Sequence, residues 1–151
     1  MAQAEIRELE PQETALAFEA MLELRPRLGS EESFVARVNK VQRPEGFRLV
    51  ASFAEGDPRA TAVAGFRIIN SLVWGKALYV DDLSTRAIYR RRGHASAILD
   101  WLLQEARRLG CDQPHLDSGV QAERMDAHRL YFNKAMRISA HHFEMALSPS
   151  D

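Results

Sequence analysis

The chain contains little cysteine and no long apolar run. Cys111 is the sole cysteine among 151 residues, so no disulfide can form within the chain, and a reducing compartment is expected. No apolar segment approaches the roughly 20 residues that span a bilayer. The N-terminal stretch carries Glu5, Glu8 and Glu10 and does not resemble a signal peptide. We therefore expect a cytoplasmic protein without a membrane partner.

An excess of one charge is also missing. The chain has 20 Lys+Arg and 21 Asp+Glu, which gives a formal net charge of −1 at pH 7. Such a chain has no global positive field that would attract nucleic acid. A nucleic-acid-binding domain that uses Arg90 to Arg92 and Arg107-Arg108 is therefore the weakest of three hypotheses, and we expect no nucleic-acid partner.

Several common catalytic and metal motifs are absent. The sequence has no Gly-x-x-x-x-Gly-Lys phosphate loop, no Gly-x-Ser-x-Gly elbow, no Gly-x-Gly-x-x-Gly and no His-Glu-x-x-His. His141 and His142 are adjacent, so on a strand they would point to opposite faces, and no third ligand is evident. We expect no metal site.

What is present predicts one globular domain of mixed helix and strand over residues 1–151. Apolar content of 46% and charged content of 27% are ordinary for such a domain. Periodicity and turn residues predict an edge strand at 4–9, helices opened by Pro11 and by Ser30, and strands at 47–54, at 60–69 and from Leu78. Further on they predict a helix from Gly93 to Leu109, a strand at 113–118, a short helix capped by Asp126 that runs to Lys134, and a terminal strand or hairpin arm at 138–147.

The strand from Leu78 changes phase at two acidic residues. Leu78 and Val80 share one face, but Leu83 has the opposite parity, with Asp81 and Asp82 between. A β-bulge at the two aspartates would return Leu83 to that face, whereas a strand covered on both faces would need no bulge. The long helix that follows is the usual right-handed crossover, so residues 113–118 are expected to lie parallel to this strand.

The loop between this strand and the long helix breaks a rule of helix electrostatics. Arg90, Arg91 and Arg92 sit beside Gly93 at a helix N-terminus, where unpaired amides already carry partial positive charge. A phosphate or pyrophosphate would compensate that charge, and a glycine allows the close approach of such an anion. Taken alone, the arginines would be read as solvated charges. The strand before them and the amphipathic helix after them favour the anion cradle.

Arg90-x-x-Gly93-x-Ala95, after Leu83-Ser84-Thr85, resembles the acetyl-CoA signature of the GCN5-related N-acetyltransferases. The resemblance continues through residues 126–132 to the last predicted strand. It implies an α+β fold with a central, mostly antiparallel twisted sheet of about six or seven strands, one parallel pair splayed at the cofactor site, and about four flanking helices. It also implies acetyl-CoA as cosubstrate, held by Leu83, Ser84, Thr85, Arg90, Arg91, Arg92, Gly93, His94, Ala95 and Ser96.

The same resemblance implies direct attack of a primary amine on the thioester. Tyr131 matches the general acid that protonates the departing thiolate, and a backbone amide near Leu83 would stabilise the oxyanion. For the base, Asp81 or Asp82 is the first candidate, with Asp81 as the working assignment, and Glu23 and His142 come behind. A catalytically silent acyl-CoA sensor of the same fold is the second hypothesis.

Two positions depart from the family pattern, and the acceptor is not specified. Ala135-Met136 stands where the family often has Gly-Phe, and Arg124 stands where many members have asparagine. The resemblance places the acceptor groove at residues 19–33, where the match is weakest, so the amine is a small molecule, a protein lysine or an N-terminus. Dimers are common among similar proteins, and a homodimer is therefore one expectation.

Overall fold

The computed structural model describes residues 4–148. The chain divides into two compact units, one ending at Leu116 and one beginning at Asp117, and each is described separately. The prediction of a single domain over residues 1–151 therefore remains a prediction.

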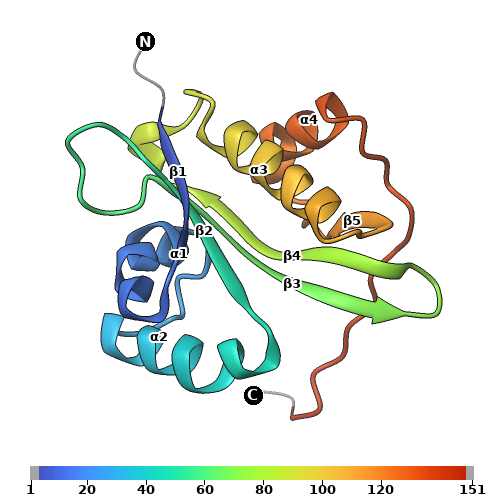
Figure 1. Cartoon of the computed structure of the whole chain (residues 1–151), viewed down its shortest axis with the longest axis horizontal. Helices are drawn as coiled ribbons and strands as arrows, with labels where there is room; N and C mark the ends of the chain where they lie inside the picture. The colour runs from blue at the N-terminus through green and yellow to red at the C-terminus, as the bar shows by residue number, and fades with distance from the viewer. Residues whose placement is uncertain (1–3, 149–151) are drawn as a thin grey trace. The chain divides into compact units, whose positions relative to one another are not determined.

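A five-stranded sheet forms the centre of the first unit (Figure 1). The strands follow chain order across the sheet: β1 (Glu5–Leu9), β2 (Arg48–Phe53), β3 (Ala62–Ser71), β4 (Gly75–Thr85) and β5 (Gln113–Leu116). β1 to β4 are antiparallel, whereas β5 pairs with β4 in parallel through the Ala77–Gln113 to Val80–Leu116 positions. The α+β class, the edge strand and the single parallel pair are confirmed.

The strand count is lower than expected. Residues 138–147 were predicted as a terminal strand or hairpin arm, yet the segment is not a strand. Phe143, Met145 and Leu147 are 84–92% exposed. Alternation predicts a strand only where a neighbouring strand takes up the backbone hydrogen bonds, and no strand within residues 4–148 pairs with this one.

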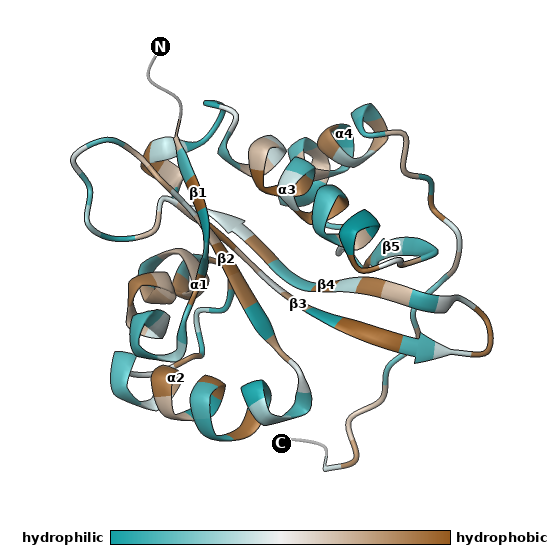
Figure 2. Cartoon of the chain, in the orientation of Figure 1, coloured by the Kyte–Doolittle hydropathy of each residue, from teal (hydrophilic) through white to brown (hydrophobic). Residues whose placement is uncertain are grey.

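Helices cover both faces of the sheet in the first unit. α1 (Phe18–Leu24) and α2 (Glu31–Arg37) lie on one face, where Phe34, Leu49 and Val63 belong to a single buried cluster. α3 (His94–Arg108) lies on the other, where Phe66 of β3 meets Trp101 edge to face at 5.9 Å. Figure 2 shows both hydrophilic and hydrophobic residues around α3, as a helix with one face on a sheet requires.

The ends of these helices follow from local chemistry. A 3₁₀ helix at Pro11–Ala17 leads into α1. The Ser30 hydroxyl accepts the amide of Ser33 at 3.1 Å, which confirms Ser30 as the start of α2. After Arg37 the helix widens into a π-helical turn at Val38–Gln42 and closes at Gly46, whose φ is 97°.

The predicted bulge in β4 is present at Asp81. Val80 lies opposite Phe66 and Asp82 lies opposite Gly65, so Asp81 has no partner on β3. Asp81 is therefore one extra residue in β4, and beyond it the alternation of side chains between the two faces of the sheet reverses. Leu83 consequently returns to the α3 face with Val80, and Asp82 faces the side of α1 and α2.

Gly65 permits a close approach at this bulge. A Cβ on Gly65 would lie 2.3 Å from Cζ of Phe47 and 3.0 Å from an oxygen of Asp82. The Phe47 ring is buried in the cluster beneath α1 and α2, so it cannot move aside without opening that cluster. The glycine therefore fixes both the ring and the carboxylate.

The second unit contains α4 (Met125–Asn133). Asp126 was expected to cap this helix, but the helix begins at Met125 and Arg124 occupies the cap position. A 3₁₀ turn at Ala122–Arg124 precedes it. Ala135 has a φ of 64°. That left-handed conformation is nearly free of strain only for glycine, so Ala135 is strained at this position.

Gly65→Ala tests the packing at the bulge. We expect this substitution to lower the free energy of unfolding by about 1–3 kcal/mol, because the added methyl overlaps the Phe47 ring. The loss should be smaller in a Phe47→Leu background, where the ring is absent, so the two changes should be non-additive in chemical denaturation. Equal losses in both backgrounds would contradict the proposed overlap.

Candidate anion cradle and bulge site

The N-terminus of α3 lies beside an open glycine. Gly93 is the residue before the helix, has a φ of 87° and offers no side chain to cap the first turn. The first turn is closed by the Ala97 amide, which donates to the Gly93 carbonyl at 3.0 Å. The amides of His94, Ala95 and Ser96 precede that bond and have no intrahelical acceptor. No heavy atom lies within 4 Å of the position that a Gly93 Cβ would take, so this turn is open.

Three arginines, Arg90 to Arg92, directly precede Gly93 and these amides in the chain. Arg90 donates from Nε to the Thr85 carbonyl at 3.1 Å and lies 3.6 Å from Glu23. The Arg92 guanidinium sits 5.8 Å from the centre of the Tyr89 ring. Arg91 holds a φ of 65°, a conformation that costs a non-glycine residue about 1–2 kcal/mol. Cations and backbone strain therefore meet at an uncapped helix end, which is the arrangement that binds an anion.

The edge of β4 is open next to this cradle. Pairing with β5 stops at Val80, so residues 81–85 have no strand on that side among the described residues. The Arg86 amide donates to Thr61 of the β3 side at 2.9 Å. Because bonded and non-bonded pairs alternate in an antiparallel ladder, Leu83 and Thr85 direct their N–H and C=O groups to the open edge, and Ser84 directs its own to β3. The bond from Arg90 to the Thr85 carbonyl agrees with this assignment.

A side-chain cluster anchors the loop between β4 and α3. One oxygen of Asp57 accepts the Tyr89 hydroxyl at 2.6 Å and the Arg86 guanidinium at 2.9 Å, while the other accepts the Arg59 amide. The Tyr89 hydroxyl, with these other donors, lowers the pKa of Asp57. Asp57 thus ties the β2–β3 loop to the residues that lead into the cradle.

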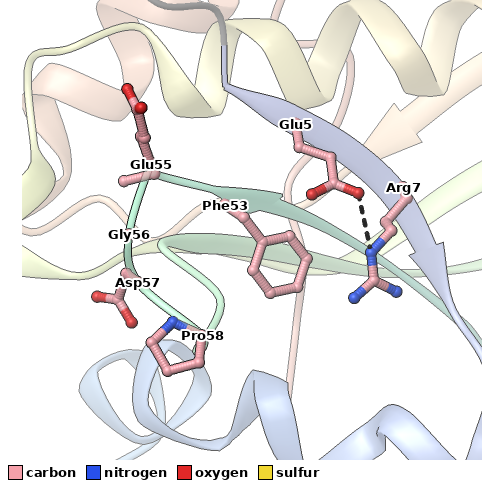
Figure 3. Close-up of a pocket in the computed structure, with 8 residues that line it drawn as sticks. Glu5, Arg7, Phe53, Glu55, Gly56, Asp57 and Pro58 are labelled. Atoms are coloured by element: carbon pink, nitrogen blue, oxygen red, sulfur yellow. Dashed lines mark ion pairs between the residues drawn. The ribbon is translucent and has the colours of Figure 1, made fainter.

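Figure 3 shows Asp57 on the rim of a surface cavity of about 630 Å³, between β1 and the β2–β3 loop. Glu5 and Arg7 line the same cavity and pair with each other at 3.3 Å. This cavity is separate from the uncapped helix end, because Arg90 to Ser96 do not line it.

His94 presents only its backbone to the cradle. Its ring is buried, and Nδ1 lies 2.7 Å from the Ser52 hydroxyl of β2. Burial, and secondarily the charge of Arg92, lowers the pKa of His94 below its ordinary 6.5. The side chain therefore fastens the first turn of α3 to the sheet and leaves the amide for a ligand.

The two aspartates at the bulge have different partners. Asp81 receives two hydrogen bonds from Arg67, at 2.7 and 2.8 Å, in a bidentate pair. Asp82 accepts a hydrogen bond from Nε of Arg25 at 3.0 Å, and the Asp82 side chain is 15% exposed. Burial raises the pKa of Asp82, which makes it a stronger proton acceptor than an ordinary exposed carboxylate.

The other predicted site residues lie in different surroundings. Glu23 accepts the Ala87 amide at 2.7 Å and so holds the loop before the cradle. In the second unit, His142 lies 3.0 Å from Asp117, and Tyr131 is 8% exposed. Burial raises the pKa of Tyr131, so its phenol is protonated at neutral pH.

Neither a metal cluster nor a membrane span is found in the part of the chain that the structure describes. Residues 4–148 contain no group of three or more His, Cys, Asp or Glu placed to hold a metal ion. No helix in that range is long and apolar enough to cross a membrane.

These features define an α+β protein whose sheet opens beside an uncapped helix end. Comparison with known families gives a more specific answer: residues 8–135 match the model of the acetyltransferase (GNAT) family. The uncharacterized N-acetyltransferase YhdJ of Bacillus subtilis is 33% identical over 123 residues, which cover 82% of this chain and 83% of that protein. The chain belongs to the acetyltransferase (GNAT) family.

Solved structures agree on the fold. An aminoglycoside N-acetyltransferase AAC(6')-Iy, solved in complex with CoA, superposes with a TM-score of 0.79 at 13% identity, covering 97% of this chain and 95% of that one. A ribosomal-protein-alanine N-acetyltransferase from Brucella melitensis superposes with a TM-score of 0.78 at 17% identity, covering 97% and 100%.

Sequence reasoning missed the arginines that hold the bulge carboxylates. Arg67 precedes Asp81 by 14 positions and Arg25 precedes Asp82 by 57, so neither pair has a local signature. Arg67 alone carried a weak signal, because a charged residue within an apolar strand requires a partner. Arg124 was noted only as a departure from the family pattern, yet it hydrogen-bonds with the Tyr131 side chain.

His94 should make stability depend on pH. The unfolded chain binds a proton near pH 6.5 whereas folded His94 resists it, so the free energy of unfolding should fall as the pH drops below about 6.5. His94→Gln should remove this dependence and cost about 1 kcal/mol at pH 8 through the altered bond to Ser52. Urea unfolding between pH 3 and 8 measures both effects.

The carboxylate of Glu105 provides a control at lower pH. Arg108, together with Arg48, lowers the pKa of Glu105 from 4.5 to about 2, so its contribution to stability is lost only as the pH falls below about 4.5. That loss should be identical in His94→Gln. If His94→Gln kept the parent's dependence of the free energy of unfolding on pH between pH 5 and 6.5, a group other than His94 would be responsible for it.

Proposed function

We propose that this protein transfers the acetyl group of acetyl-CoA directly to a primary amine, without a covalent enzyme intermediate. The observation that carries the proposal is the uncapped N-terminus of α3, open at Gly93 and bordered by Arg90 to Arg92. Family membership and the CoA complex of a protein with the same fold support acetyl-CoA as the cosubstrate.

The chain offers separate contacts for the two ends of acetyl-CoA. The amides of His94, Ala95 and Ser96 would hold the diphosphate, with Arg91 and Arg92 beside them. The open edge of β4 would pair with the pantetheine arm at Leu83 and Thr85, with Ser84 between them. Because Arg90 already binds the Thr85 carbonyl, it is placed at the entrance where the arm would meet the cradle.

The chemical step needs an oxyanion donor and an acid. In the proposed reaction the amine nitrogen forms a bond to the thioester carbon as the C–S bond breaks. The Leu83 amide would donate to the carbonyl oxygen as negative charge develops there. Tyr131 would give its proton to the departing thiolate, and its raised pKa keeps that proton available at neutral pH.

A base must take the proton that the ammonium loses. Both Asp81 and Asp82 lie at the bulge next to Leu83, and we favour Asp82. Both oxygens of Asp81 already accept hydrogen bonds from the Arg67 fork, so the incoming amine would have to displace that fork. Asp82 is largely buried and its one side-chain partner, Arg25, is half exposed, so an amine can replace that partner.

The sensor hypothesis keeps the same cradle without transfer, and Tyr131 is the feature that favours an enzyme. The cytoplasmic location, the homodimer and the absence of a nucleic-acid partner remain predictions.

Gly93→Ala tests the cradle. We expect the Kd for acetyl-CoA to rise about tenfold or more, because a methyl blocks the approach of the anion and strains a φ of 87°. Gly110→Ala is the matched control: it has a φ of 73°, open space around the Cβ, and lies at the other end of α3. Both variants should lose similar stability, and only Gly93→Ala should lose affinity in calorimetry. The absence of acetyl-CoA binding by the parent at millimolar concentration would refute the proposed function.

Measurement of thiol release with a panel of amines distinguishes the role of Tyr131 as the acid from that of Asp82 as the base. Tyr131→Phe should lower kcat by about 10²-fold or more with unchanged acetyl-CoA affinity. Asp82→Asn should lower activity at neutral pH by a similar factor and recover as the pH rises, because more of the amine is then unprotonated. Asp81→Asn is the comparison, and a larger loss there would make Asp81 the base. If the parent turned over no amine while binding acetyl-CoA, the sensor hypothesis would replace the enzyme.

A further inference from the structure

A second cavity adjoins the bulge on the face of the sheet that α1 and α2 cover. Its volume is about 390 Å³, near the lower end of the range for small-molecule sites. Phe47, fixed against Gly65, forms part of its wall. Its charged lining consists of Arg25, Arg37, Arg67, Glu45, Asp81 and Asp82.

Most of these charges are already balanced. Arg67 is bound by Asp81, and the charge of Glu45 also acts on Arg67. Arg25 reaches across the cavity to Asp82 at 2.9 Å and donates to the Asp81 carbonyl at 3.1 Å. The Arg25 side chain is 51% exposed, so the partner of the buried Asp82 carboxylate is a guanidinium that water can also solvate.

Arg37 is the exception. It lies in the last turn of α2 and has no hydrogen-bond or ion-pair partner within residues 4–148. The helix then widens into the π-helical turn Val38–Gln42, which brings Val41 and Gln42 into the same wall. Such widened turns occur frequently at functional sites. The extra residue in the turn changes the direction in which the following side chains point.

We propose that this cavity binds the acceptor and that the acceptor is a small amino acid-like zwitterion, with its amine at Asp82 and its carboxylate on Arg37. The inference rests on the proposed acetyl transfer. Arg25 holds the place of the substrate ammonium in the free protein and moves into solvent when the amine arrives. The planar guanidinium of Arg37 then receives the carboxylate with two hydrogen bonds.

The charge distribution disfavours other amines. A diamine or polyamine would bring its second positive charge toward Arg37 and Arg67, and the exposed Glu45, which lines the same cavity, already acts on the charge of Arg67. A neutral alkylamine would leave Arg37 without a partner and gain nothing from it.

The test compares ω-amino acids of three to six carbons with alkylamines of equal length, because their amines have similar pKa values. Calorimetry first establishes acetyl-CoA binding, and thiol release then gives kcat/KM for each acceptor. The parent should favour the amino acid by about tenfold or more, the effect of one charge-assisted hydrogen bond. Arg37→Gln should remove this preference through KM and leave alkylamine rates within about twofold, while Arg37→Glu should shift it toward diamines.

Arg27→Gln is the matched control, since Arg27 is exposed, lies outside the cavity and has no partner within residues 4–148. Its acceptor preference should equal that of the parent. Thermal unfolding of each variant checks that the fold is intact.

The outcomes separate the two proposals. If acetyl-CoA does not bind, the proposed function and this inference both fail. If acetyl-CoA binds but alkylamines or diamines are preferred, or Arg37→Gln leaves the preference unchanged, only the zwitterion proposal is overturned. If no amine is turned over, direct calorimetry decides: the amino acid must bind the parent more tightly than the alkylamine and lose that advantage in Arg37→Gln.

Discussion

One extra residue in β4 sets the arrangement of the candidate site. The bulge at Asp81 reverses the alternation of faces, so Val80 and Leu83 can both pack under α3 although their parity differs. The same reversal turns Asp82 toward α1 and α2. Pairing with β5 ends at Val80, next to the bulge, and leaves the edge from Asp81 to Thr85 open. The outward direction of the Leu83 amide and the placement of the buried Asp82 carboxylate are therefore consequences of a single insertion.

Electrostatics distinguishes the two neighbouring aspartates. A bidentate guanidinium satisfies both oxygens of Asp81. Asp82 is more buried and has the weaker, more exposed partner, so its charged form is less favoured. Adjacent identical residues thus acquire different hydrogen-bond partners and different burial, and both partners are arginines far away in sequence.

The loop that enters α3 combines an unstable local arrangement with strong anchors around it. Uncapped amides, three arginines and a left-handed Arg91 are each unfavourable by themselves. Asp57 holds Tyr89 and Arg86 on one side, and Ser52 holds the His94 ring on the other. These bonds keep the loop in a conformation that a bound anion would stabilise further.

Local periodicity, capping and backbone freedom predicted the helix start at Ser30, the bulge and the glycine before α3. The α+β class followed from the family resemblance, and the parallel pair followed from the crossover helix together with that resemblance. The sequence predicted the strand at residues 138–147 wrongly, since a local pattern cannot say whether a partner strand is present. Tertiary structure alone decided which arginine meets which aspartate, the overlap that keeps position 65 a glycine, and the cavity that leaves Arg37 without a partner. Those properties depend on residues brought together from distant parts of the chain, and no local pattern records such distances.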